Sequence, residues 1–195
     1  TDDGCGIPAE QLTLAVASHA TSKITSADDL FHVGTLGFRG EALASIAEVS
    51  QLSLRSRRGE DEAGYEVEVT GGVRRETTPC GCPRGTTIEV RNLFYNTPVR
   101  RKFLRASQTE IGHCTEAFTR IALAQPGVNF TLRHNEKLLF DLPPTANWRE
   151  RIAAFFGRDL ESSLIALDNR DGDLHLFGFA ADPQHSRANN RLQYI

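Results

Sequence analysis

The chain has 195 residues, of which 39% are hydrophobic and 24% are charged, and its formal net charge at pH 7 is -3. This length and composition suit one large domain, or one domain and part of another. The charge balance indicates no overall affinity for nucleic acid, and no apolar run approaches the roughly 20 residues that cross a bilayer. We therefore expect no membrane partner, and only local basic clusters for any contact with DNA.

The first half of the chain alternates between helix and strand patterns. Pro8 suits the first turn of a helix, and apolar residues recur at helical spacing as far as His19. A polar segment from Thr21 toward Gly37 predicts a long loop with one short helical turn near Leu30, and long loops in compact domains often bind ligands. The elements expected next are a helix over 39–48 and strands over 51–55, 65–70, 73–77 and 86–91, with a hairpin turn at 71–72.

The second half shows helical patterning over 99–104 and 111–124, where Pro126 and Gly127 stop it. Strands over 128–134 and 137–142 should form a hairpin. Pro143 and Pro144 break the pattern and predict a domain boundary, which divides the chain into 1–143 and 144–195. Beyond it we expect a helix over 148–156 and strands over 164–167, 174–181 and 191–195. Sequential antiparallel strands, with helices on one sheet face, predict the α+β class.

Both ends of the sequence are typical of a protein that continues beyond them. The chain contains no methionine. It opens on Thr1-Asp2-Asp3-Gly4, a pattern typical of the exit from a strand, and it ends on an alternating strand-like segment. We expect it to be an internal fragment of a longer protein.

The four cysteines do not have the spacing of a disulfide framework or a zinc site. Cys80 and Cys82 are too close for a structural zinc knuckle, and no second pair of ligands follows them. No signal peptide is visible. We expect reduced thiols, no metal ligands and a cytoplasmic location.

Two glycine-containing segments could contact a nucleotide. Asp2, Gly4 and Gly6 form an acidic turn whose carboxylate could accept a hydrogen bond from an exocyclic amine, although an ordinary Asx turn explains the same residues. Gly37 and Gly40 precede a helical pattern, where free backbone N–H groups could hold phosphates. Their spacing by itself favours a tight turn.

Three further segments carry polar groups that suit nucleotides or nucleic acid. Thr21, Ser22 and Lys23 suit phosphate oxygens, or serve only solubility. Thr86 could face a base or belong to a tight turn. The run from Arg100 to Arg105 is the strongest cationic cluster, and it could contact a DNA backbone or be a solvated helix face.

Taken together and in this order, these segments resemble the GHKL ATPase superfamily, whose ATP-binding domain has the Bergerat fold. Three stretches narrow the resemblance to the MutL family of DNA mismatch repair proteins: His19 to Ile24, Gly37 to Leu43 and Asn92 to Leu104. The match is dense over 1–142 and loose beyond. It implies a Bergerat-type α/β sandwich over 1–143, and over 144–195 the beginning of a domain like that of ribosomal protein S5.

The resemblance also implies a site for ATP and Mg²⁺. Asp2 would recognise adenine, Gly4 and Gly6 would shape the pocket, and Thr86 would support the base. Thr21, Ser22 and Lys23 would belong to a lid over the triphosphate. The acidic turn and the glycine segment must then face one nucleotide. The segment that contacts the phosphates would consist of Gly37, Phe38, Arg39, Gly40, Glu41, Ala42 and Leu43.

Three catalytic residues of the family have no counterpart in this sequence. The family's general base, and an asparagine that holds magnesium, lie on a helix before the acidic turn, and a lysine of the second domain reaches the γ-phosphate. Asp3 also stands where asparagine is commoner. We expect no catalytic residue here and little ATP hydrolysis by this chain alone, whereas the longer protein would be an ATPase.

The resemblance implies an ATP-driven matchmaker that couples mismatch recognition to strand incision in the bacterial cytoplasm, at the nucleoid during repair. Its partners would be a second MutL-type chain in an ATP-dependent N-terminal dimer, mismatch-recognition and strand-incision proteins, and DNA bound non-specifically. One alternative is another GHKL enzyme, such as a topoisomerase subunit, a chaperone or a histidine kinase. The other is a non-catalytic DNA-binding or interaction module.

Overall fold

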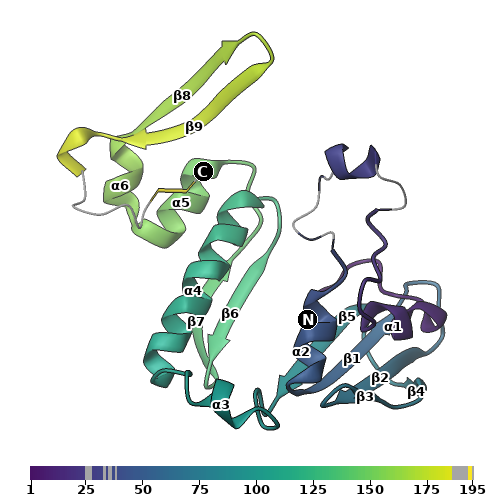
Figure 1. The fold of residues 1–195 in the computed structure, drawn as a ribbon. Coiled ribbons are helices and arrows are strands. Elements are labelled where there is room, and N and C mark those ends of the chain that lie inside the picture. Colours follow the sequence, from purple (N-terminus) through teal and green to yellow (C-terminus); the bar gives the residue numbers. More distant parts are fainter. Residues whose placement is uncertain (25–27, 33, 35–36, 38, 186–192, 195) are drawn as a thin grey trace. The chain divides into compact units, whose positions relative to one another are not determined.

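The computed structural model describes all residues except 25–27, 33, 35–36, 38, 186–192 and 195 (Figure 1). The chain forms two compact units, Thr1–Leu104 and Arg105–Ile195. Both units combine helices with antiparallel strands, so the predicted α+β class is confirmed. None of the described helices is long and apolar enough to span a membrane.

The first unit is built on an antiparallel sheet with the strand order β3-β2-β1-β5. The strand β2 pairs with both β3 and β4. The predicted strands are confirmed at 51–55, 65–70 and 86–91, with ends that differ by at most two residues. The predicted hairpin turn is also confirmed, because Gly71 and Gly72 both have positive φ, as a two-residue turn between β2 and β3 requires. The strands are β1 (Gln51–Arg57), β2 (Gly64–Thr70), β3 (Val73–Arg74), β4 (Thr78–Cys80) and β5 (Gly85–Arg91).

The strand predicted over 73–77 is wrong in its extent. Only β3, at Val73–Arg74, is a strand there, and pairing with β2 resumes in β4. The register explains the interruption: Val69 lies opposite Arg74, but Glu66 lies opposite Thr78, which leaves one extra residue on the outer strand. An extra residue disrupts a ladder locally, as in a β-bulge.

Two short helices, α1 (Ala9–Ala15) and α2 (Ala42–Glu48), cover one face of this sheet (Figure 1). Both are shorter than the sequence predicts. α1 ends at Ala15, because Val16 has a φ of -103° and a ψ of 5°, outside the helical region. α2 begins only after Gly40, whose positive φ a right-handed helix excludes. The predicted helical turn near Leu30 is present as a 3₁₀ helix, η1 (Asp28–His32). The core beneath the helices consists of Leu12, Val16, Ala47, Leu52, Leu54, Val67 and Val69.

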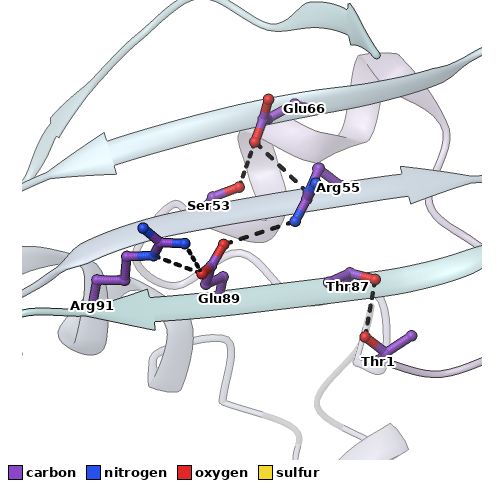
Figure 2. Close-up of polar contacts among 7 residues, drawn as sticks. All are labelled: Thr1, Ser53, Arg55, Glu66, Thr87, Glu89 and Arg91. Atoms are coloured by element: carbon purple, nitrogen blue, oxygen red, sulfur yellow. Dashed lines mark hydrogen bonds and ion pairs between the residues drawn. The ribbon is translucent and has the colours of Figure 1, made fainter. Parts of the chain in front are cut away.

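The opposite face of the sheet is polar (Figure 2). Arg55 of β1 lies between Glu66 of β2 and Glu89 of β5, with N–O distances of 3.9 and 3.7 Å, and Ser53 donates a hydrogen bond to Glu66. Such partly exposed ion pairs contribute little stability each. Their main effect is on register, since a one-residue slip would bury them and expose the leucines of β1.

The second unit combines a long helix with two hairpins. The predicted hairpin around 135–136 is confirmed, and Asn135 and Glu136 both have positive φ at its turn. The strand predicted over 164–167 continues to Asp171, because its polar end pairs with β9 throughout. The elements are α4 (Ser107–Ala124), β6 (Phe130–His134), β7 (Lys137–Leu142), α5 (Trp148–Phe156), α6 (Arg158–Ser163), β8 (Leu164–Asp171), β9 (Leu174–Ala181) and η2 (Pro183–His185).

Arg151 of α5 holds this unit together from a buried position. Its Nη2 atom donates to the carbonyl oxygens of Pro126, Val128 and Pro143, at 2.6, 2.8 and 2.9 Å. Burial lowers the pKa of this guanidinium. These bonds join α5 to the chain on both sides of the β6–β7 hairpin. The expected boundary at 143–144 therefore lies inside the second unit, and as a domain boundary it stays a prediction.

Replacing Leu54 with alanine should test the core of the first unit. Leu54 is fully buried in the centre of β1. We expect a loss of about 2–5 kcal/mol in the free energy of unfolding, measured by urea denaturation, because the truncation leaves a cavity under both helices. Leu14→Ala is the matched control, since Leu14 is 56% exposed on α1 and its truncation should change stability by less than about 0.5 kcal/mol. Equal effects of the two variants would contradict this assignment of the core.

Candidate nucleotide-binding site

The acidic turn is held against the start of β5 by a reciprocal pair of hydrogen bonds. The backbone N–H of Asp2 donates to the carbonyl oxygen of Thr86 at 2.8 Å, and the N–H of Thr86 donates to Asp2 Oδ1 at 3.2 Å. The N–H of Gly4 donates to the same carboxylate oxygen at 2.9 Å. Asp2 Oδ1 thus positions the turn, while Oδ2 takes no part in these bonds. The structure thus brings the predicted acidic turn together with Thr86, which the sequence singled out separately.

Ser56 supports this arrangement from below, and the sequence analysis missed it. It is only 1% exposed, its Oγ donates to the carbonyl of Gly85 at 2.9 Å, and it lies 3.0 Å from Thr86 Oγ1. The same Oγ accepts a hydrogen bond from the N–H of Ile7 at 2.8 Å. The sequence does contain an indication of this role, because Ser56 follows Leu52 and Leu54 at alternate positions of β1 and should therefore be buried. A buried polar side chain needs a hydrogen-bond partner nearby.

Two glycines allow the turn to approach the sheet this closely. Gly6 has a φ of 77° and Gly85 a φ of 104°, both in the region that side chains disfavour. A Cβ atom on Gly6 would clash with the carbonyl of Arg57, and one on Gly85 would clash with the carbonyl of Asp2. Gly6 therefore acts through backbone geometry, which is compatible with the role in shaping the pocket that the resemblance implies.

The glycine segment lies against the loop that follows α1. Gly40 has a φ of 64°, and a Cβ atom there would clash with the carbonyl group of Ala20. Beside it, His19 Nδ1 is 3.1 Å from Glu41 Oε1. The segment around His19 and the segment around Gly40, both expected at the triphosphate, are therefore neighbours. Because α2 has only seven residues, its dipole adds little to any phosphate site.

The remaining predicted residues belong to the Thr21–Lys23 turn and to the segment that leads into α2. Thr21 Oγ1 accepts a hydrogen bond from the N–H of Lys23 at 3.1 Å, so this piece forms a local turn, with Ser22 exposed within it. Gly37, Arg39 and Ala42 are exposed, and Leu43 packs against the core. Phe38 lies outside the described residues.

The bonds described above tie the acidic turn to β1 and β5, and the glycine segment to the loop after α1, and none of them joins the acidic turn to the glycine segment. One hollow of the first unit surrounds Cys80 and Cys82, and another lies among Val16, Ala44 and Val69. Neither is lined by Asp2, Thr86 or Gly40. The common orientation of both groups toward one nucleotide stays a prediction.

An open apolar surface adjoins the acidic turn. Ile88 and Val90 of β5 lie opposite Leu54 and Leu52 of β1, so their side chains are on the face that the helices cover. Both are nevertheless 41% exposed. Since Thr86 belongs to the same face and strand, this surface offers an apolar contact for a flat ring near Asp2.

Comparisons with known proteins give a consistent result. No protein-family model matches the sequence. The whole chain is 45% identical to the DNA mismatch repair protein MutL of Anaeromyxobacter sp. (strain K), and 99% of it is 47% identical to MutL of Haemophilus influenzae (strain Rd). The chain spans about a third of the length of these relatives, 32% and 31% respectively.

Solved structures show the same relationship in three dimensions. The match to the Aquifex aeolicus MutL ATPase domain complexed with ADP covers 86% of this chain and 58% of that domain's chain, with 33% identity and a TM-score of 0.63. Another structure of the Aquifex aeolicus MutL ATPase domain matches 95% of this chain over 61% of its own, with 29% identity and a TM-score of 0.67.

The first unit, with its acidic turn docked on an antiparallel sheet and two helices on one face, thus has the α+β fold of the GHKL class. Similarity over the whole chain narrows the assignment. The chain belongs to the MutL family of DNA mismatch repair proteins, as its motifs predict.

Substituting the two glycines that precede α2 with alanine should show which of them the fold requires. Gly40→Ala should destabilise the first unit by at least about 2 kcal/mol, because alanine disfavours positive φ and its Cβ would clash with Ala20. Gly37→Ala is the control, since a Cβ there meets no atom within 4 Å. Thermal unfolding measures both. A Gly40→Ala variant as stable as Gly37→Ala would contradict the described packing.

Proposed function

We propose that this chain is the ATP-binding region of a MutL-type DNA mismatch repair protein. The observation that carries the proposal is the Asp2 carboxylate, which is oriented through Oδ1 and lies beside the open apolar face of β5. The relative of known structure that is complexed with ADP supports it, because that domain shares this fold.

In this proposal Asp2 Oδ2 accepts a hydrogen bond from the adenine amino group. The two backbone N–H donors on Oδ1 keep the carboxylate from rotating, so little conformational entropy is lost when the base binds. Thr86 lies beside the base, and Ile88 offers its exposed apolar surface to the ring. An acceptor at this position favours adenine over guanine, which carries a carbonyl oxygen where adenine carries the amine.

The triphosphate would lie toward the Thr21–Lys23 turn and the Gly40 segment. Because Gly40 packs directly on Ala20, phosphate contacts on either segment would constrain both. Binding of ATP would thereby order a lid, promote association of two N-terminal regions, and be reversed by hydrolysis.

Mg²⁺ would accompany the nucleotide, held chiefly by its phosphates, as is usual for this ion. The described residues contain no group of three or more His, Cys, Asp or Glu side chains that could hold a metal ion. No catalytic step is therefore assigned to the metal or to these residues, and we propose that this chain by itself hydrolyses little ATP.

For the complete protein we propose a bacterial cytoplasmic matchmaker that couples mismatch recognition to strand incision. It would act with a second MutL-type chain, with mismatch-recognition and strand-incision proteins, and with DNA. We also propose a domain boundary near 143–144, with the beginning of an S5-like domain beyond it. The sequence similarity to complete MutL proteins over about a third of their length supports these proposals.

Asp2→Asn should test the adenine contact. Asparagine can keep the Oδ1 bonds of the turn but places an NH₂ donor where Oδ2 stood, so it repels the adenine amine and suits a guanine carbonyl. We expect at least a tenfold weaker affinity for ATP and a lower preference for ATP over GTP. The measurement is titration with fluorescent ATP and GTP analogues and Mg²⁺, on the protein extended to the full length of its relatives.

The neighbouring variant Asp3→Asn is the matched control, since it removes the same charge from an exposed side chain next to Asp2. It should leave both affinities unchanged. If Asp2→Asn lowered both affinities equally, Asp2 would have only a structural role. Absence of saturable ATP binding by the unmodified full-length protein would favour the alternative of a non-catalytic interaction module.

Non-specific DNA binding would use the exposed basic side chains at α3 (Pro98–Arg101). We expect Arg100→Ala/Arg101→Ala to weaken binding of this chain to duplex DNA, and to reduce the slope of log K against log salt by about two, because two phosphate contacts are lost. Arg74→Ala/Arg75→Ala removes the same charge from exposed positions elsewhere. Equal weakening by this control would assign the effect to net charge rather than to α3. Fluorescence anisotropy at several salt concentrations gives both quantities.

A further inference from the structure

Cys80 and Cys82 lie together on the polar face of the first sheet. The pairing of β4 with β2 sets Cys80 opposite Gly64 and Thr78 opposite Glu66, so Cys80 is on the same face as Glu66. Figure 2 shows Glu66 and Arg55 on this face. The sulfur of Cys82 occupies the space above Gly64, where a Cβ atom would clash with it. Cys80 at the end of β4 and Cys82 in the loop that follows are thus both placed at Gly64 of β2.

The two thiols also interact. The pKa of Cys80 is raised to about 11, first by burial and then by the charge and hydrogen bonding of Cys82. Glu66 raises this pKa further, and Arg55 lowers it. Both cysteines line the same hollow of the first unit, which agrees with their common position at Gly64. Cys5 and Cys114, by contrast, are exposed on the acidic turn and on α4.

A shallow hollow of about 420 Å³ gives solvent access to the pair. Its lining includes both cysteines together with Arg57, Glu62 and Gly64. Both cysteines are half-buried at this hollow. None of this geometry is used by the proposed nucleotide site.

The ligand set determines which ion suits this place. The described residues offer no third His, Cys, Asp or Glu ligand arranged with the two sulfurs, which excludes a tetrahedral zinc site made by protein ligands alone. Hard cations such as Mg²⁺ prefer oxygen ligands. Two thiolates suit a soft cation that is stable with low coordination, and Cu(I) is the common ion of this kind.

We propose that Cys80 and Cys82 form a two-sulfur binding site for Cu(I). Binding replaces the two thiol protons with one metal ion, and the protons pass to solvent. No oxidation is involved. The metal must displace a proton that burial holds on Cys80, and Arg55, the one described group that lowers this pKa, offsets part of the negative charge of the resulting bis-thiolate complex.

The test compares two variants that each retain two thiols. Cys5→Ser/Cys114→Ser keeps the pair, and Cys80→Ser/Cys82→Ser keeps only the two separate cysteines. Each reduced 195-residue protein is titrated anaerobically with Cu(I), supplied as its acetonitrile complex, against the chromogenic Cu(I) chelator bicinchoninate. We expect the first variant to withdraw one equivalent of Cu(I) with at least tenfold higher affinity than the second. Equal withdrawal by both variants would overturn the proposal.

Single variants and a spectroscopic measurement guard against a folding defect. Thermal unfolding in the absence of metal should give the same transition for all variants. Cys80→Ser and Cys82→Ser, each in the Cys5→Ser/Cys114→Ser background, should each lose most of the affinity, since one sulfur cannot chelate. X-ray absorption of the Cu(I)-loaded pair variant should show two sulfur neighbours. A first shell of nitrogen or oxygen atoms alone would also overturn the assignment.

Discussion

The docking of the acidic turn on the edge of β5 is the constraint on which the proposed site depends. Asp2 and Thr86 exchange two hydrogen bonds across 84 positions of sequence, and Gly85 adopts a left-handed conformation to let the backbones approach. The carboxylate is thereby oriented before any ligand arrives. Because one carboxylate oxygen is engaged by two N–H groups, the turn and the side chain form a single rigid unit.

This rigid unit depends in turn on how the sheet separates its two faces. The leucines of β1 face the helices, and Arg55 and its acidic neighbours face solvent. Ser56 lies on the same buried face as the leucines of β1. Its hydroxyl group forms hydrogen bonds with Ile7, Gly85 and Thr86. The same alternation that builds the core therefore places a polar anchor under the acidic turn. The strand β1 therefore supplies both the core leucines and the serine that positions the proposed site.

The two glycine-containing segments differ in physical character. The acidic turn is fixed by several hydrogen bonds to the sheet, whereas the segment at Gly40 is positioned by close backbone contact with Ala20 and an exposed pair between His19 and Glu41. In the proposed function, the acidic turn would be a fixed ring-binding end and the Gly40 segment a more weakly held phosphate end, as a nucleotide-dependent switch requires. The base would then bind without rearrangement, and the phosphates would change the conformation of the loop.

Much of the local structure was predictable because it depends on short-range patterns. Alternation in β1 and β5, the Gly71–Gly72 turn and the helical spacing before Pro126 each act over a few residues, and the motifs around Gly40 and Asn92 pointed to the family. Helix ends were less predictable, since the positive φ of Gly40 accompanies its close packing on Ala20, which lies 20 positions away. The bulge between β3 and β4 depends likewise on pairing with β2.

The sequence by itself thus determined the α+β class and most strands, and it predicted the residues of the proposed nucleotide site. Only the tertiary structure decided that β5 lies beside β1, that Ser56 supports Thr86, and that Cys82 covers Gly64. The physical reason is the range of the interactions. Propensity and periodicity act between near neighbours, whereas these contacts join residues 18 or more positions apart, and their geometry is set by strand pairing and by the exclusion of overlapping atoms.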